Sequence, residues 1–241
     1  MFMYGMYGYG YGYGFDPTII LVLIGVALSL WAQGRVNSTF SRYSRVRSMT
    51  GMTGAEAARR LLNAQGIYDV TVQPIAGELT DHYDPRTKTV NLSQSVYGAT
   101  SVAAIGVAAH ECGHAMQDNE GYAPLRFRSA LVPAANFGSK LSWPLILLGL
   151  VFGGLGSPLV EIGILMFSLA VLFQLVTLPV EYNASARAVR LLDSQGILAG
   201  EEVSGTRKVL NAAALTYVAA AATSILQLLR LIILFGRKKQ T

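Results

Sequence analysis

Residues 103–117 read AAIGVAAHECGHAMQ, and most of what the sequence predicts depends on this stretch. Its small apolar side chains favour a helix, on which positions four residues apart lie on the same face. His110 and His114 have this spacing, so both imidazoles can reach one ion, and their nitrogens suit Zn²⁺. Glu111 is turned toward the open side, where it can take a proton from a metal-bound water. Cys112 projects about 200° away from His110, so we expect a small buried residue and not a ligand.

The histidine pair has two interpretations, a metal site or two histidines satisfied inside a core helix. The chain has three histidines, and two of them stand at ligand spacing, which favours the metal site. A catalytic zinc needs a third protein ligand and an open position for water. Glu181 is attractive because it follows an apolar hairpin and begins the amphipathic pattern EYNASARAVRLL. Its competing interpretation is a charge at a membrane interface or at a helix N-terminus. The other candidates are His82, Asp81, Asp84, Asp118 and Glu120.

The composition points to a small domain with membrane segments. Of the 241 residues, 52% are hydrophobic and only 14% are charged, which is too apolar for a soluble enzyme. A single cysteine excludes an intramolecular disulfide framework and a zinc cluster with several thiolates. The net charge of +5 comes from basic residues that cluster beside apolar runs, where they fix membrane orientation more often than they bind phosphates. We therefore expect a lipid bilayer, and no nucleic acid, as a partner.

Residues 15–33 are expected to form an N-terminal transmembrane helix, preceded at 1–14 by a low-complexity Tyr/Gly leader. A cleaved signal peptide fits poorly, because no positive region precedes the apolar run and no small-residue cleavage site follows it. Arginines follow instead, and positive charge beside a span marks the cytoplasmic side. We expect the N-terminus outside and the next domain facing the cytoplasm. The arginines are Arg35, Arg42, Arg45 and Arg47.

Residues 34–140 are predicted to contain the domain that carries the histidine helix. Thr53 and Glu56 form a capping box for a helix that runs to about Ala64. Alternating and β-branched residues then predict a short antiparallel sheet. A long helix follows, from Ser93 or Ser95 to about Asp118. The three strands are expected at 68–75, up to about Tyr83, and at 88–92.

The second half of the chain is dominated by apolar segments. Residues 141–180 predict a transmembrane hairpin, and 181–211 the helix region that carries Glu181. Residues 212–235 predict a last apolar helix, followed by a basic tail at 236–241. Three spans already return the chain to the cytoplasm, so a fourth full span would put the basic tail outside. Either the last segment does not cross completely, or the charge rule fails at the tail.

Three motifs carry a resemblance to a known family: GELTDHYDPRTKTVNLS at 77–93, HECGHAMQ at 110–117 and VEYNASARAVRLLD at 180–193. With them, the sequence from Asp16 to about Phe235 resembles the YugP-type family of membrane zinc metallopeptidases. It is more distantly similar to the HtpX and CAAX prenyl-protease group.

In the HtpX and CAAX prenyl-protease group, a Glu at the head of a Glu-aromatic-x-Ala-Asp helix is the third ligand beside the two histidines. The residues from Glu181 to Ala184 match this pattern, so the resemblance implies Glu181 as third ligand. Ser185 stands where the distant group has an Asp that would orient a ligand histidine.

Together these features predict an α-helical membrane protein with a small α+β, zincin-like (gluzincin-like) catalytic domain. The expected function is an integral-membrane zinc metallopeptidase that holds one Zn²⁺ with His110, His114 and Glu181. Glu111 would be the general base, and a protein or peptide the substrate. We expect the protein in the cell membrane, with its catalytic domain facing the cytoplasm. A zinc hydrolase of another amide or ester, and a non-catalytic zinc-binding scaffold or chaperone, are the alternatives.

Two features of the mechanism stay open at the level of sequence. The developing oxyanion needs a donor besides zinc, and nothing in the sequence selects one. The strand at 88–92 is a candidate edge to which an extended substrate could add by backbone pairing. The residues considered for the oxyanion or for orienting a ligand are His82, Tyr182, Asn183, Ser185 and Arg187.

Overall fold

The computed structural model describes residues 16–154 and 157–236 of the chain. The expected leader at 1–14 and the tail residues 237–241 lie outside the described residues. The described chain is mostly helical and contains one three-stranded sheet. Its elements are α1 (Ile19–Tyr43), α2 (Gly54–Ala64), β1 (Thr71–Ile75), β2 (His82–Asp84), β3 (Thr89–Ser93), α3 (Gln94–Tyr97), α4 (Val102–Asn119), α5 (Ala123–Gly153), α6 (Pro158–Ser194) and α7 (Glu201–Gly236).

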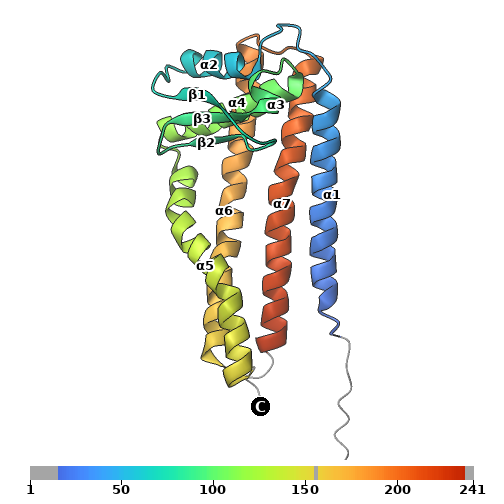
Figure 1. Cartoon of the computed structure of the whole chain (residues 1–241), viewed down its shortest axis with the longest axis vertical. Coiled ribbons are helices and arrows are strands. Elements are labelled where there is room, and N and C mark those ends of the chain that lie inside the picture. Colours follow the sequence, from blue (N-terminus) through green and yellow to red (C-terminus); the bar gives the residue numbers. More distant parts are fainter. Residues whose placement is uncertain (1–15, 155–156, 237–241) are drawn as a thin grey trace, which may run out of the picture.

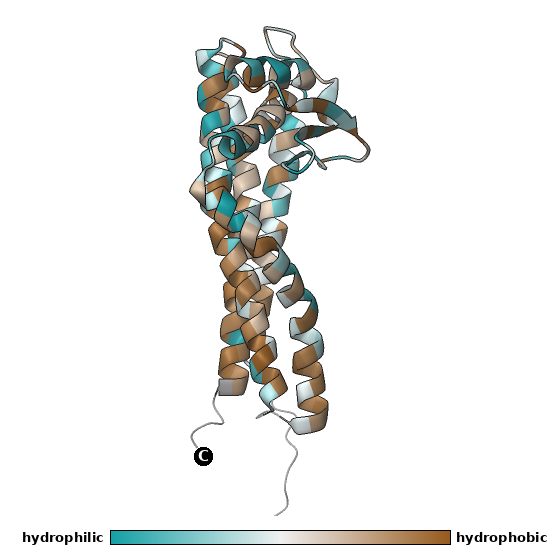
Figure 2. Cartoon of the chain, turned by 90° about the vertical axis from the view of Figure 1, so that its left-hand side faces the viewer, coloured by the Kyte–Doolittle hydropathy of each residue, from teal (hydrophilic) through white to brown (hydrophobic). Residues whose placement is uncertain are grey.

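Four long helices, α1, α5, α6 and α7, form the body of the molecule (Figure 1). They pack in a row in which α5 contacts α6, α6 contacts α7 and α7 contacts α1. All four are long and apolar enough to cross a membrane. Figure 2 shows hydrophobic residues along most of their length and hydrophilic residues toward one end. Large side chains stay exposed on the apolar part, such as Leu30 at 68% and Val151 at 75%, as expected for surfaces that face lipid.

The remaining elements, α2, α3, α4 and the sheet, gather at one end of the long helices (Figure 1), which we call the compact end. The predicted capping box is confirmed: Thr53 accepts a hydrogen bond from the Glu56 amide, and Glu56 accepts one from the Thr53 amide. The predicted long helix from Ser93 or Ser95 is instead two helices. Ser101 explains the break, because its side chain caps α4 by accepting from a backbone amide in the first turn.

The sheet has the order β1-β3-β2, with β1 parallel and β2 antiparallel to β3. The prediction of an antiparallel sheet is right for β2 and β3 and wrong for β1. The connection 76–81 is long enough to carry the chain across β3, so β2 pairs on its far side. β3 is therefore the central strand, and the expectation that 88–92 offers a free edge is wrong. Its Val90 and Leu92 are fully buried in the core.

Two helix boundaries differ from the expected segments. α5 begins at Ala123 and not near 141, because hydropathy marks only the part of a helix that is apolar. Pro133 and Pro144 lie inside α5, and Figure 1 shows this helix changing direction along its length. α6 continues through Glu181, so the helix region expected from 181 is an extension of the hairpin's second span.

α7 runs from the compact end to the opposite end of the molecule (Figure 1). There Arg230 lies 2.9 Å from Asp16, which stands just before α1. The apolar segment expected at 212–235 is thus the later part of a helix that is long and apolar enough to cross a membrane. Whether it crosses completely or the charge rule fails at the tail stays open.

Candidate metal centre

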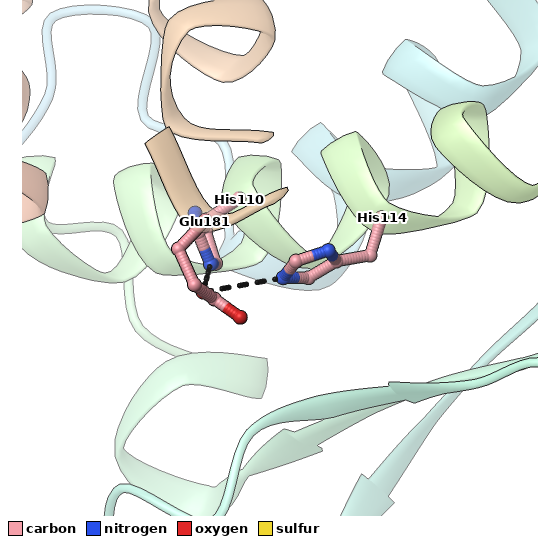
Figure 3. A group of neighbouring side chains, drawn as sticks. All are labelled: His110, His114 and Glu181. Atoms are coloured by element: carbon pink, nitrogen blue, oxygen red, sulfur yellow. Dashed lines mark hydrogen bonds and ion pairs between the residues drawn. The ribbon is translucent and has the colours of Figure 1, made fainter. Parts of the chain in front are cut away.

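His110 and His114 of α4 converge with Glu181 of α6 (Figure 3). One ligand atom from each residue lies within 4.8 Å of the others. The Oε2 atom of Glu181 is 3.2 Å from Nε2 of His110 and 3.5 Å from Nε2 of His114. The structure therefore brings together the three residues that the sequence and the resemblance single out.

A close approach of two helices places Glu181 beside the histidines. A Cβ atom at Gly113 would stand 2.6 Å from the backbone oxygen of Ala184, so α4 has no room for a side chain there. Ala184 is fully buried in α6, three residues after Glu181. Glycine at position 113 thus lets α6 lie directly against the histidine helix.

Hydrogen bonds on the far side of each ring orient the two imidazoles. Nδ1 of His114 donates to the side-chain oxygen of Gln117 at 3.0 Å, and the Gln117 amide donates in turn to Val180 and Asn183 of α6. Nδ1 of His110 lies 3.1 Å from the Ser185 hydroxyl. Both rings consequently direct Nε2 toward Glu181, which is the arrangement in which a neutral imidazole binds a metal.

The site is buried and negatively charged. Glu181 is 2% exposed, Glu111 7% and His114 8%. Burial lowers the pKa of His114, but the neighbouring carboxylates of Glu181 and Glu111 outweigh burial and leave that pKa raised. Two carboxylates around a pair of imidazoles favour a cation at this position.

The other candidates for the third ligand are held by different partners. His82 uses both ring nitrogens, because Nδ1 donates to the Thr80 carbonyl and Nε2 accepts from Asn91. The four acids are paired as follows: Asp81 with Ser93, Asp84 with Arg86, Asp118 with Tyr83 and Lys88, and Glu120 with Arg187.

Three residues considered for the oxyanion lie away from the histidine pair. Asn183 accepts from Gln117 and from Arg187, whose other end meets Glu120. Tyr182 is 47% exposed and lines cavities on a different face. Ser185 does contact a ligand histidine, in the position where the distant group has Asp.

A cavity of about 260 Å³ opens onto the metal centre and contains two side chains that the sequence did not single out. Arg128 of α5 places a guanidinium nitrogen 3.7 Å from Glu181, and its Nε atom is buried with no hydrogen-bond partner in the described part of the chain. Tyr217 of α7 lines the same cavity, and its acidic neighbours are Glu181 and Glu111. A polar group inside an apolar run is the sequence feature that could have pointed to Tyr217. No comparable feature of the sequence around Arg128 points to that residue.

Residues 18–236 match a protein family described as "Putative neutral zinc metallopeptidase". The chain belongs to this zinc metallopeptidase family. It is also 49% identical, over 217 residues, to the "Putative membrane protease YugP" of Bacillus subtilis (strain 168). That alignment covers 90% of this chain and 96% of the relative. No solved structure matches the chain.

Membership of the zinc metallopeptidase family confirms the predicted resemblance and supports a membrane protease that uses zinc. The donor set agrees with the metal in the family description. Two imidazole nitrogens and one carboxylate form a ligand set typical of catalytic zinc, and a cavity beside them leaves space for water and substrate. These residues therefore fit a zinc ion.

Proposed function

We propose that the chain is an integral-membrane zinc endopeptidase in which His110, His114 and Glu181 hold one Zn²⁺. The observation that carries this proposal is the convergence of their ligand atoms within 4.8 Å at a cavity that Glu111 also lines. A site with three protein ligands and an open side is typical of catalytic zinc, whereas structural zinc is usually enclosed by four ligands.

Glu111 is the proposed general base. A bound zinc ion would supply a Lewis acid and lower the pKa of its water toward neutrality. Glu111 lines the cavity, and within the described residues no side chain donates a hydrogen bond to its carboxylate. It is therefore free to take a proton from water and to deliver it to the leaving amine.

We assign oxyanion stabilisation to Arg128, with Tyr217 as a second donor. Both side chains line the cavity. His82 lines it too, but its two ring nitrogens are hydrogen-bonded to Thr80 and Asn91, and Asn183 and Arg187 are occupied elsewhere. The Arg128 side chain is 29% exposed beside the centre, and its guanidinium could donate to a substrate carbonyl oxygen in the cavity.

The proposed location is the cell membrane, with the compact end in the cytoplasm. The basic residues at the end of α1 and just after it support this orientation, because Arg35 and Arg42 of α1 and the following Arg45 and Arg47 lie where the chain leaves the apolar span and enters the compact end. The substrate would accordingly be a protein or peptide presented at the cytoplasmic face.

Replacing Glu111 by Gln tests the function. Glu111→Gln should retain zinc, because the ligands are intact, and should lose peptide hydrolysis by about 10²–10⁴-fold. Zinc per chain and cleavage of casein or a peptide are measured on the purified protein in detergent. Glu120→Gln, an exposed acid paired with Arg187, is the matched control and should keep both.

The outcomes separate the alternatives. Equal hydrolysis by the wild type and by Glu111→Gln would contradict the proposed peptidase function. Zinc without hydrolysis of any peptide, but with turnover of another amide or an ester, would indicate a non-peptidase hydrolase. Zinc without any turnover would indicate a scaffold or chaperone.

A further inference from the structure

A second large cavity lies away from the metal centre, between α1, α6 and α7. Its volume is about 680 Å³, and we call it the basic cavity. Three cations line it, Arg35 and Arg42 from α1 and Lys208 from α7, together with Tyr43 and Tyr182. None of the residues that line the cavity at the metal centre takes part.

The positive charge of the basic cavity is not neutralised by the protein. Among the residues that the structure describes, no acidic side chain forms an ion pair with any of its three cations. A second cavity of about 450 Å³ adjoins it and shares Tyr182 and Asn211. That cavity adds the two cations Arg190 and Arg207 against one acid, Asp193. An anionic ligand would therefore meet an excess of positive charge.

The level of the basic cavity along the helices agrees with a membrane interface. Arg35 lies sixteen residues after Ile19, the first residue of α1, which corresponds to roughly 24 Å of helix. A hydrocarbon core is about 30 Å thick, so Arg35 stands near its edge. Trp31, one turn closer to the apolar part and on the same face, is 55% exposed, as is common for tryptophan at an interface.

Apolar surface continues from the basic cavity along α7. Lys208, Asn211 and Leu215 line the cavity at a spacing of three and four residues. The same helical spacing continues into exposed apolar side chains on this face. They are Val218 at 37%, Ile225 at 44%, Leu229 at 44% and Ile232 at 50% exposed.

α6 repeats this arrangement from Tyr182. Leu175, seven residues earlier, and Leu172 are 43% and 41% exposed on the same face of the helix. One side of the bundle thus presents cations at the compact end and exposed apolar side chains beyond them.

We propose that the basic cavity binds an anionic phospholipid. The phosphate would lie among Arg35, Arg42 and Lys208, and the acyl chains would lie along the exposed apolar rows of α6 and α7. A free anion would leave the apolar rows unused, and a zwitterionic lipid would leave the excess positive charge unmatched. This inference does not depend on the proposed peptidase function.

The test compares lipids retained by the full chain in nanodiscs that contain phosphatidylcholine and a minor fraction of phosphatidylglycerol. Native mass spectrometry should show that the wild type retains phosphatidylglycerol in preference to phosphatidylcholine. The double variant Arg35→Gln/Lys208→Gln should reduce this preference by about tenfold. The variant Arg45→Gln/Arg47→Gln loses the same amount of charge outside the cavity and should keep the preference for phosphatidylglycerol. The charge-preserving pair Arg35→Lys/Lys208→Arg should also retain it.

Three results would overturn the proposal. Equal retention of both lipids by the wild type would show that no anionic headgroup is recognised. An equal loss in the Arg45→Gln/Arg47→Gln control would indicate general surface charge. Displacement of the lipid by inorganic phosphate or by soluble glycerophosphoglycerol would indicate a site for the phosphate group alone. Each measurement detects lipid and not peptide cleavage, so an inactive peptidase would leave the inference intact.

Discussion

At the scale of single residues, Glu181 has the most demanding position, since its carboxylate lies between two imidazoles and faces the Arg128 guanidinium. The two imidazoles and the guanidinium can each interact favourably with the negative charge of this carboxylate. Removing it would leave two histidines, which bind zinc weakly by themselves.

Glu181→Ala should therefore lower zinc occupancy of the purified chain well below one ion. Metal analysis after dialysis against a weak chelator measures the effect. Glu120→Ala removes an acid on the exposed surface and should keep the zinc. Full occupancy of Glu181→Ala would mean that another residue, such as His82 after release of its hydrogen bonds, completes the site.

Arg128 supports a second prediction at this scale. Arg128→Gln should lower kcat by about 10²–10³-fold with little change in KM or in zinc content, because a donor to the oxyanion acts mainly in the transition state. Arg126→Gln, an exposed arginine one half-turn away on α5, is the matched control. A parallel loss of zinc in Arg128→Gln would instead assign Arg128 to holding Glu181.

The sequence allowed the residues with a fixed local spacing to be predicted. His110, Glu111 and His114 belong to one helical face, and the family pattern brought in Glu181. Arg128 and Tyr217 were beyond such reasoning, because only the packing of α5 and α7 around the cavity gives them a common neighbour.

At the scale of elements, the contact between α4 and α6 governs the distance between the two histidines and Glu181. Gly113 lies at this contact, where a Cβ atom would stand 2.6 Å from the Ala184 carbonyl oxygen. Any side chain there would separate the two helices.

Gly113→Ala should thus reduce zinc affinity and lower the free energy of unfolding by about 1–3 kcal/mol. Zinc titration and thermal unfolding in detergent check the two effects. Gly98→Ala is the control, since a Cβ atom there would meet nothing within 4 Å. Comparable losses in both variants would show that the substitution, and not the helix contact, is responsible.

Elements determined by local interactions were predicted well, and those determined by distant pairing were not. The Thr53 and Glu56 capping box concerns neighbours in sequence and was correct. The parallel pairing of β1 with β3 depends on the path of 76–81, and alternating hydrophobicity contains no information on that path. Hydropathy likewise missed the first half of α5, because its more polar residues give no span signal.

At the scale of the whole molecule, the start of α1 and the compact end lie at opposite ends of the bundle (Figure 1). If the compact end faces the cytoplasm as proposed, the thiol of the Pro17→Cys variant should react with a membrane-impermeant maleimide in intact cells. A cysteine at Glu78→Cys should react only after permeabilisation. The reverse pattern would invert the proposed orientation.

The native thiol suits this labelling experiment. Cys112 is fully buried, and burial raises its pKa, so it contributes little reactive thiolate. The unsubstituted chain should accordingly stay unlabelled and supplies the background for both variants.

The continuity of α6 has a consequence for biosynthesis. The histidine pair leaves the ribosome well before Glu181. In the proposed membrane arrangement, Glu181 would reach the pair only after the hairpin of α5 and α6 had entered the bilayer and returned. A nascent or wrongly inserted polypeptide would therefore possess two imidazoles without their carboxylate partner. In this architecture, hydrolytic competence would arise at the end of membrane insertion, which would protect the cell from an incomplete and unanchored protease.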